Sequence, residues 1–293
     1  MIRIGIVGTD SSHALAFSSL CNLINPVTKN YNYKDTRITH VFGLDKVETY
    51  RVAKEGLIPN IVTSVEDMID QVDAVMILFR DGNLHIPYAR LFLMANVPLW
   101  IDKPFAIVNQ EAVDFIKQAQ ERGVLLTGGS TCRYNLDVLN LKKKLDSSEL
   151  GVLVSAYINF PGDINSSYHG LHFYGPHLIE MIFAIFGYDI ISVTSSSNQE
   201  ELICIVKYKD KSIILNFNTQ ITDATCFLHG KKQSHIGTIL INKDTYKAGF
   251  DQFIQMLVTK ELPIPYKNLN SSIILIHGIL ESLKEKKEVF ISL

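Results

Sequence analysis

The first thirteen residues constrain the fold of this chain more than any other segment. An apolar run, Ile4-Gly5-Ile6-Val7, ends at Gly8, and a polar stretch then leads into a helical pattern that begins near His13. A strand, a glycine turn and a helix in this order point free backbone N–H groups and the positive end of the helix dipole at an anion such as a pyrophosphate. The segment predicts the opening unit of a dinucleotide-binding fold.

The glycine fingerprint of such folds, G-x-G-x-x-G, is incomplete here. Gly8 takes the first glycine position, whereas Asp10 and His13 replace the next two. We expect the Asp10 side chain to cap its own helix and so to turn away from a phosphate. A plain structural turn is the alternative to a phosphate loop. The predicted phosphate-binding residues are Gly8, Thr9, Asp10, Ser11, Ser12 and His13.

Short apolar runs alternate with helical patterns through residue 127, which is typical of β-α-β units and a parallel sheet. The expected strands are Arg3–Val7, Ile38–Gly43, Ala74–Leu78, Pro98–Ile101 and Val124–Thr127. The expected helices are His13–Asn25, Lys46–Glu55, Ser64–Gln71, His85–Ala95 and Asn109–Arg122. Residues 1–127 are therefore predicted to form a doubly wound α/β domain of the Rossmann type.

The pattern changes after residue 127 to one of helices and successive β-rich runs joined by short polar turns, as antiparallel hairpins require. We expect residues 128–293 to form an α+β domain with an open, mostly antiparallel sheet. The expected helices are Leu136–Leu145, Pro176–Phe186, Tyr246–Thr259 and Ser271–Lys286, and the expected strands are Val152–Phe160, Ile190–Thr194, Leu202–Tyr208, Ser212–Asn218, Ala224–His229 and His235–Ile241.

Composition excludes several classes of protein. The net charge of −2 and the lack of a long basic run argue against nucleic acid as a partner. No signal peptide is visible, and no apolar run approaches the ~20 residues of a membrane span, so we expect a cytoplasmic protein that makes no use of a membrane. Four scattered cysteines without C-x-x-C spacing indicate buried thiols and no metal site.

Two further positions suit a bound dinucleotide. Asp45 follows the second expected strand, where an acid accepts hydrogen bonds from the adenosine ribose. A carboxylate there would repel a 2′-phosphate, so it favours NAD, with NADP as the alternative; an ordinary surface acid is the other interpretation. Lys103 and Pro104 come directly after an apolar strand, at the sheet edge where ligands bind. An ordinary exposed lysine is again the alternative.

These motifs together resemble the glucose-fructose oxidoreductase and inositol dehydrogenase (Gfo/Idh/MocA) family over nearly the whole chain. The resemblance is carried by Asp102-Lys103-Pro104 in place of Glu-Lys-Pro, by His85 after the fourth strand, and by the segment Tyr174–Glu180 with its His177. It implies an NAD(P)-dependent oxidoreductase that acts on a sugar, a polyol or a related hydroxy compound in a cleft between the domains. It also implies that the final helix, Ser271–Lys286, returns to the first domain.

The resemblance assigns roles to individual residues. Lys103 would lie between nicotinamide and substrate and would hydrogen-bond the reacting hydroxyl, with Asp102 and His85 near the cofactor. His177 would contact the substrate hydroxyl. The residues expected to line the sugar pocket are Arg133, Tyr134, Tyr174 and His177.

One departure from the family pattern bears on catalysis. The family aspartate four residues before the histidine falls on Phe173. Either His172 or His177 would then transfer the proton, or the usual oxidation does not occur. A catalytically silent dinucleotide- or metabolite-binding protein is therefore the alternative function, and a non-redox use of bound NAD is a third. The histidines near residues 169–177 would otherwise cap a helix that starts at Pro176.

The predicted second sheet leaves one apolar face without helices. In family relatives such a face builds a dimer or a tetramer, so the resemblance implies a homodimer or homotetramer. Apart from other copies of this chain, the only partner that we expect is a small-molecule substrate.

Overall fold

The computed structural model describes residues 1–293, which divide into two compact units. The first unit contains residues 1–129 and 250–269, and the second contains residues 130–249 and 270–293. We had placed the boundary at residue 127 and had expected the final helix to be the returning segment. In the structure it is Phe250–Leu269 that belongs with the first unit.

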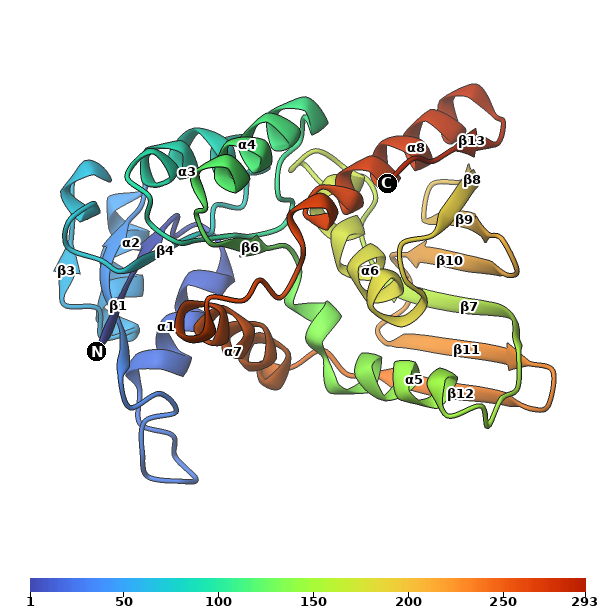
Figure 1. Cartoon of the computed structure of the whole chain (residues 1–293), viewed down its shortest axis with the longest axis horizontal. Coiled ribbons are helices and arrows are strands. Elements are labelled where there is room, and N and C mark those ends of the chain that lie inside the picture. The colour runs from blue at the N-terminus through green and yellow to red at the C-terminus, as the bar shows by residue number, and fades with distance from the viewer. The chain divides into compact units, whose positions relative to one another are not determined.

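The first unit is built on a six-stranded parallel sheet (Figure 1). The strand order is β3-β2-β1-β4-β5-β6, the order of a doubly wound Rossmann fold, as predicted. The strands are β1 (Ile2–Val7), β2 (Thr36–Phe42), β3 (Asn60–Ile61), β4 (Ala74–Ile77), β5 (Leu99–Ile101) and β6 (Leu126–Gly128). Strands β1 and β4 are almost wholly buried, because helices cover both faces of the sheet.

Four helices of this unit follow the predicted β-α alternation. They are α1 (Ser12–Asn22), α2 (Lys46–Glu55), α3 (His85–Met94) and α4 (Asn109–Arg122). A fifth expected helix, Ser64–Gln71, is wrong: only a 3-10 turn forms, at Glu66–Met68. The Ser64 hydroxyl could have capped such a helix, but it bonds the Glu66 carboxylate and leaves the backbone N–H groups uncapped.

The returning segment is held in the first unit by aromatic packing. Helix α7 (Lys243–Thr259) contributes Phe250 and Phe253. Phe250 stacks on Phe17 of α1 at 5.7 Å between ring centroids, and Phe253 meets Trp100 of β5 edge-on at 6.0 Å. All four rings are fully buried, so this segment completes the core on the α1 side of the sheet.

The second unit contains a seven-stranded sheet with the order β12-β11-β7-β10-β9-β8-β13. Its strands are β7 (Leu153–Pro161), β8 (Ile190–Ser197), β9 (Glu201–Tyr208), β10 (Ser212–Asn218), β11 (Ala224–Gly230), β12 (Ser234–Ile239) and β13 (Val289–Phe290). Only β7 and β10 are parallel neighbours, which confirms the prediction of a mostly antiparallel sheet.

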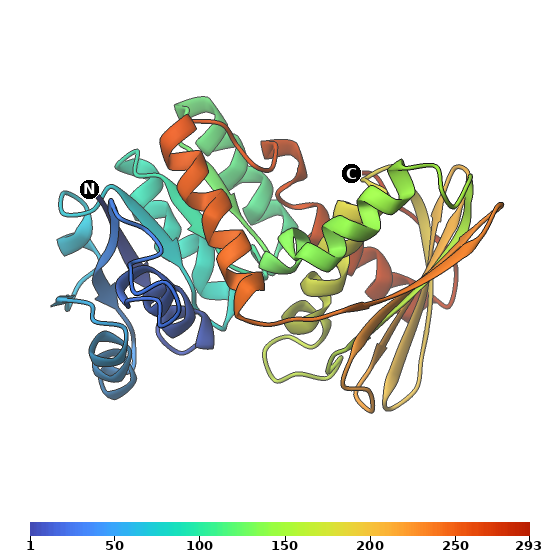
Figure 2. The ribbon, with the colours of Figure 1, turned by 90° about the horizontal axis from the view of Figure 1, so that it is seen from below.

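Three helices pack on one face of this sheet, and Figure 2 shows no helix on the other. They are α5 (Leu136–Asp146), α6 (Leu171–Phe186) and α8 (Ser271–Glu285). The final helix, α8, packs on β8 and α6 within this unit. Its apolar side, with Leu275, Ile276 and Ile279, is part of the same buried cluster as the inner face of the sheet.

Helix α6 begins five residues before the proline at which we had expected it to start. Gly170, with φ +58°, precedes the first helical residue, Leu171, and Pro176 lies inside the helix. Proline tolerates a helical φ and costs one backbone hydrogen bond there. The apolar side of α6 buries Leu171, Leu178 and Ile182, and this burial favours extension through the proline. His172 and His177 are therefore helix residues and cannot cap a helix that starts at Pro176.

The four cysteines are buried thiols that form no disulfide, as predicted. None of the helices combines the length and the apolar character that a bilayer crossing demands.

Candidate functional site

The turn after β1 admits only glycine at position 8. Gly8 has φ +103°, and a Cβ added there would lie 2.5 Å from the backbone N of Phe79. Its own N–H donates to the carbonyl of Phe42 at 2.9 Å. The backbone of this turn is thus pressed between the ends of β2 and β4, which is the close approach that a phosphate-binding loop requires.

The next residue, Thr9, fixes the loop against helix α2. Thr9 is buried, and its hydroxyl lies 3.0 Å from the hydroxyl of Thr49 on α2. Gly43, just after β2, leaves room for this contact, since a Cβ there would lie 2.0 Å from Thr9 Oγ1. Thr9 is a structural support of the loop.

Helix α1 is capped by Ser11 and not by Asp10. Ser11 Oγ accepts the N–H of His13 at 3.2 Å. The carboxylate of Asp10 instead accepts the backbone N–H of Arg80, at 3.2 and 3.3 Å, so our expectation that Asp10 caps its own helix is wrong. The backbone N–H groups of Asp10 and Ser11 have no backbone acceptor. With the helix dipole behind them, they suit an anion.

His13, at the third glycine position, contacts the acid that follows β5. Its Nδ1 bonds Oδ2 of Asp102, which is 2% exposed. Burial alone would raise the pKa of Asp102, but His13 and Lys103 outweigh it and hold that pKa below its ordinary value. The carboxylate is therefore ionised, and it lies between two basic side chains at the carboxyl edge of the sheet.

Lys103 follows Asp102 at this same edge and is 6% exposed. It precedes Pro104 through a cis peptide bond. A buried ammonium beside an ionised carboxylate has a defined position, unlike a solvated surface lysine. Of the two interpretations of Lys103 from the sequence, the ordinary exposed lysine is thus excluded.

His85 is placed differently from the cofactor contact that the resemblance implied. Its ring is fully buried, with Nδ1 2.6 Å from the carbonyl of Pro104 and Nε2 2.8 Å from the carbonyl of Phe79. Burial lowers the pKa of this imidazole. The ring lies between these two carbonyls, and the single N–H of a neutral imidazole can donate to one of them, so His85 packs between the loop after β4 and the loop after β5 and positions Lys103 indirectly.

Asp45 lies beyond β2 and is exposed. It is the N-cap of α2: Oδ1 accepts the N–H groups of Val47 and Glu48 at 2.8 and 3.1 Å. This role was not predicted, yet it occupies only one of the two carboxylate oxygens. The Oδ2 atom remains suited to a ribose hydroxyl.

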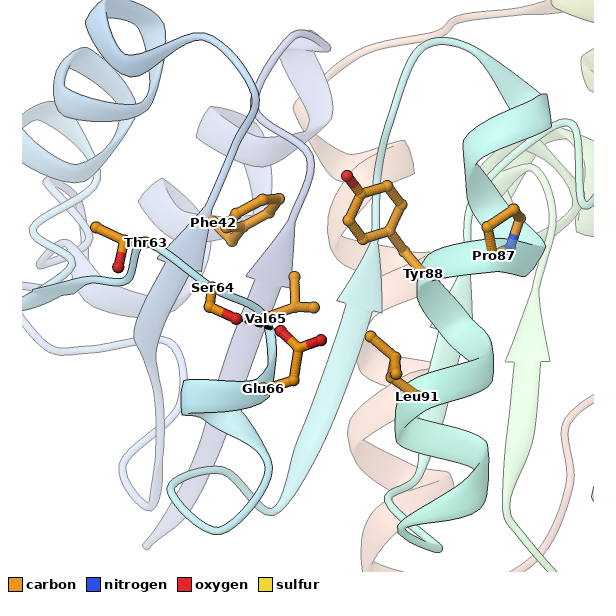
Figure 3. A pocket seen from close by; sticks show the side chains of 8 residues that line it. All are labelled: Phe42, Thr63, Ser64, Val65, Glu66, Pro87, Tyr88 and Leu91. Atoms are coloured by element: carbon orange, nitrogen blue, oxygen red, sulfur yellow. Dashed lines mark hydrogen bonds between the residues drawn. The ribbon is translucent and has the colours of Figure 1, made fainter.

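A cavity of about 330 Å³ opens beside the end of β2 (Figure 3). Phe42 and Tyr88 face it from β2 and α3, with their ring centroids 5.8 Å apart. The remaining wall comes from the segment after β3 and from α3: Thr63, Ser64, Val65, Glu66, Pro87 and Leu91. The cavity brings together three segments that no local motif links, so no local pattern predicts it.

In the second unit, His177 of α6 is paired with a serine. Ser130 Oγ lies 2.7 Å from His177 Nδ1, and Cys132 Sγ lies 3.5 Å from the same nitrogen. Ser130 is the N-cap of a 3-10 turn (Thr131–Tyr134), and its Oγ also accepts the N–H of Cys132 at 3.1 Å. The run Gly128-Gly129-Ser130 indicates such a cap, but only the fold reveals that it meets His177.

His172, the other candidate for proton transfer, is buried at 7% exposure. Its Nδ1 lies 3.1 Å from the carbonyl of His169, and its Nε2 is buried with no hydrogen-bond partner. Burial lowers its pKa, and the ring of His277 meets it edge-on at 5.5 Å. His172 is therefore a neutral, sequestered imidazole.

Arg133, expected to line a sugar pocket, is committed to a buried ion pair. Its guanidinium bonds the carboxylate of Glu180 and, at 2.6 Å, the hydroxyl of Tyr188. Burial opposes the charge of Arg133, but the neighbouring carboxylate keeps its pKa above the ordinary value. Tyr134 lies beside the guanidinium, which is 5.7 Å from the centre of its ring. The pair ties the 3-10 turn to α6.

Phe173 packs with aromatic neighbours where the family pattern has an acid. Its ring stacks on Tyr168 at 5.2 Å and meets Tyr174 edge-on at 4.9 Å. Both Phe173 and Tyr174 are half-buried. Tyr174 is therefore part of an aromatic cluster on the first turns of α6.

Comparisons with known proteins agree with this architecture. Residues 2–130 match the family described as "Oxidoreductase family, NAD-binding Rossmann fold". The uncharacterized oxidoreductase YhhX of Escherichia coli (strain K12) is 25% identical over 195 residues, 59% of this chain and 56% of that protein, so the match spans little more than half of the relative.

Two solved structures share the fold of the whole chain. Myo-inositol 2-dehydrogenase from Lactobacillus plantarum is 15% identical with a TM-score of 0.83, and each chain is covered to 99%. Scyllo-inositol dehydrogenase from Lactobacillus casei, solved with bound NAD(H) and scyllo-inositol, is 14% identical with the same TM-score and coverage.

A Rossmann unit with a glycine turn after β1, joined to an open-sheet α+β unit, defines a class of two-unit NAD-binding proteins. Residues 2–130 are similar to the NAD-binding domain of this oxidoreductase family, and the whole chain shares the fold of the inositol dehydrogenases. The chain departs from the Gfo/Idh/MocA pattern at His13, Asp102 and Phe173.

Proposed function

We propose that this protein is an NAD-dependent oxidoreductase that transfers hydride between nicotinamide and a sugar, a polyol or a related hydroxy compound. One observation carries the proposal. The glycine turn at Gly8 and the buried pair Asp102 and Lys103 lie at the same carboxyl edge of one parallel sheet, where such folds bind dinucleotides.

The residues of the first unit fit the cofactor. Only a glycine fits at position 8, and the unpaired N–H groups of Asp10 and Ser11 would hold the pyrophosphate. Asp45 Oδ2 would accept a ribose hydroxyl, and its charge favours NAD over NADP. The cavity lined by Phe42 and Tyr88 offers an aromatic surface against which a nucleobase could pack.

Chemistry at the substrate oxygen falls to this chain's own side chains. When bound, the nicotinamide would accept or return the hydride. The Lys103 ammonium would hydrogen-bond the substrate oxygen and exchange a proton with it, and Asp102 would keep the charge of that ammonium in place. In the second unit we propose His177 as a substrate contact, as its family counterpart is, and not His172, whose Nε2 is buried without a hydrogen-bond partner.

Cofactor binding and turnover test this function separately. NADH fluorescence should report binding to the wild type and to Lys103→Met, whereas turnover of sugar alcohols should be lost in that variant. Lys54→Met is the matched control, because Lys54 is an exposed lysine on α2. If Lys103→Met retains turnover, or if neither NAD nor NADP binds, the proposal fails.

A catalytically silent binding protein is the second candidate, and Phe173 favours it. The ring of Phe173 occupies the family position of the orienting carboxylate and is packed between Tyr168 and Tyr174. Binding of NAD with no turnover across a panel of polyols and sugars would support this alternative over the dehydrogenase.

We also propose that the protein forms a homo-oligomer through the open face of its second sheet. The strand registers align one residue from each of six strands in a row across that face: Thr194, Ile205, Ile214, Tyr157, Phe227 and Ile236. The nearest charge, Lys207, is paired with Glu288. A second copy could meet this row without opposing like charges.

A further inference from the structure

The cavity beside the end of β2 presents a carboxylate, that of Glu66, to the molecule that occupies it. We infer that Glu66 is a specificity-determining residue: its carboxylate accepts a hydrogen bond from the exocyclic amino group of the adenine base of the cofactor. This inference rests on the proposed function for the presence of a dinucleotide. It adds which chemical group of the base is recognised and which side chain recognises it.

The cavity is continuous with the turn that would hold the pyrophosphate. Phe42, which lines the cavity, accepts the N–H of Gly8 at its carbonyl at 2.9 Å. Tyr88, which lines it from α3, packs on Phe79 with 4.8 Å between the ring centroids, and the backbone of Phe79 lies against Gly8. A nucleotide with its phosphate at this turn would therefore have the cavity next to it.

The strand order places the cavity at the adenosine end of a bound dinucleotide. The cavity lies next to β2 and to the segment after β3, whereas Lys103 follows β5, on the other side of β1. Because we propose that the nicotinamide lies near Lys103, a dinucleotide that crosses the turn after β1 would have its other base beside β2. Asp45, which follows Phe42 closely in the sequence, would then meet the ribose of that same half.

The walls of the cavity suit a flat apolar ring with a hydrogen-bond donor at one edge. Its volume of about 330 Å³ is near the lower end of the ~300–1,000 Å³ of small-molecule sites. None of the lining residues is a lysine, an arginine or a histidine, and Glu66 is the one carboxylate among them. Figure 3 shows this carboxylate pointing toward α3. The edge of the ligand that faces Glu66 is therefore expected to donate a hydrogen bond and not to accept one.

Glu66 is held in place by its neighbours in the sequence. Val65 and Met68 are 4% and 0% exposed, and they anchor the 3-10 turn that begins at Glu66. The Ser64 hydroxyl donates to Glu66 Oε2. This bond holds the pKa of Glu66 below its ordinary value, so the carboxyl group is ionised at neutral pH. An ionised carboxylate accepts several hydrogen bonds, and Oε1 can therefore accept one from a ligand.

Two analogues of NAD change the group that Glu66 is proposed to recognise. Hypoxanthine has a carbonyl where adenine has its amino group, and that oxygen would face the negative charge of Glu66. An etheno bridge between the amino nitrogen and the adjacent ring nitrogen of adenine removes the donor without adding a carbonyl. The first analogue adds a repulsion and the second adds bulk, so a loss of affinity that both share points to the missing donor.

Calorimetry of the full chain with NAD, nicotinamide hypoxanthine dinucleotide and etheno-NAD measures the preference. We expect the wild type to bind NAD about tenfold more tightly than either analogue, a modest factor because Glu66 is exposed. In Glu66→Ala the three affinities should agree within about threefold, because the acceptor is gone. Equal affinities in the wild type would overturn the inference, and so would an unchanged preference in folded Glu66→Ala.

Three further variants separate recognition of the amino group from packing against the ring. Tyr88→Leu should weaken all three dinucleotides by a similar factor of about five, because packing does not depend on the amino group. Unchanged affinities in that variant would place the base elsewhere and refute the inference. Ser64→Ala should reduce the preference for NAD only in part, since Glu66 loses its support and keeps its charge. Glu111→Ala is the matched control and should keep the full preference, because Glu111 is an exposed glutamate of α4 outside the cavity.

Turnover then distinguishes this inference from the proposed function. Binding of NAD with the expected preference but without turnover of any sugar or polyol would refute the proposed function and support the role of Glu66. Turnover with equal affinity for the three dinucleotides would refute the role of Glu66 and leave the proposed function intact. A wild type that binds none of the three would overturn both.

Discussion

Gly8→Ala probes the turn on which cofactor binding depends. The new Cβ would lie 2.5 Å from Phe79 N and 2.9 Å from both Leu78 C and Phe79 Cα, all of them backbone atoms that follow β4. Real Cβ atoms do not approach so closely, and no flexible side chain can move aside. The φ of +103° adds conformational strain. We expect the free energy of unfolding to fall by about 2–4 kcal/mol.

The one tryptophan makes this measurement local. Trp100 is fully buried in the first unit, packed with Phe17 and Phe253, so urea unfolding followed by its fluorescence reports that unit. NAD binding, measured by calorimetry below the denaturant midpoint, should weaken in the same variant, because the loop must move away from its productive position.

Gly123→Ala is the matched control for backbone strain without collision. Gly123 ends α4 with φ +67°, in the same unit, and no atom lies within 4 Å of a Cβ added there. It should cost about 1 kcal/mol and leave NAD binding unchanged. If Gly8→Ala proves no more destabilising than Gly123→Ala and still binds NAD, the close packing of the turn does not support the cofactor site.

Three further outcomes follow from the second unit. Glu180→Gln should lower the free energy of unfolding, measured by urea titration, by about 3–5 kcal/mol, because it leaves the Arg133 charge buried without its carboxylate partner. The control Glu200→Gln, at an exposed position, should change that free energy by less than about 0.5 kcal/mol. His172 has a folded-state pKa below its unfolded value of about 6.5, so the unfolded chain takes up the proton first and the free energy of unfolding falls as the pH drops below that value. His172→Gln should reduce this loss of stability between pH 7 and 5, measured by unfolding followed by circular dichroism. Phe227→Glu should yield monomers by light scattering, whereas Glu200→Gln should not, and a wild-type monomer would contradict the proposed interface.

Local patterns predicted the first unit well because its strands are buried on both faces and its turns carry specific residues. Strand β4 is a continuous apolar run, and Lys46–Glu55 and Asn109–Arg122 are helices with the predicted ends. The exception is Ser64–Gln71, where the Ser64 hydroxyl bonds the Glu66 side chain and does not cap a helix. A single side-chain hydrogen bond of this kind does not change the hydrophobic periodicity of the sequence, so that periodicity could not predict it.

Tertiary packing determines two features of the fold that the local sequence patterns did not predict. The segment 250–269 joins the first unit because Phe250 and Phe253 complete its aromatic core, and nothing in their spacing names Phe17 or Trp100 as partners. For the same reason a proline that reads as a helix start lies inside α6, since burial of Leu171 outweighs the lost hydrogen bond.

The residues that depart from the family pattern acquire partners that account for them. In the first unit, a histidine in place of the third glycine would crowd the helix, but His13 turns its ring to Asp102 and so places a base beside a buried acid. His13 and Lys103 in turn hold the pKa of Asp102 below its ordinary value despite its burial, so the carboxylate is ionised. A chain that had merely lost its chemistry would have no need to keep a carboxylate ionised at 2% exposure, since replacing such buried charges by apolar residues is often neutral or stabilising. The retention of this charged group favours a catalytic site over a silent one, and the loss of turnover in Lys103→Met with binding intact is the result on which that argument depends.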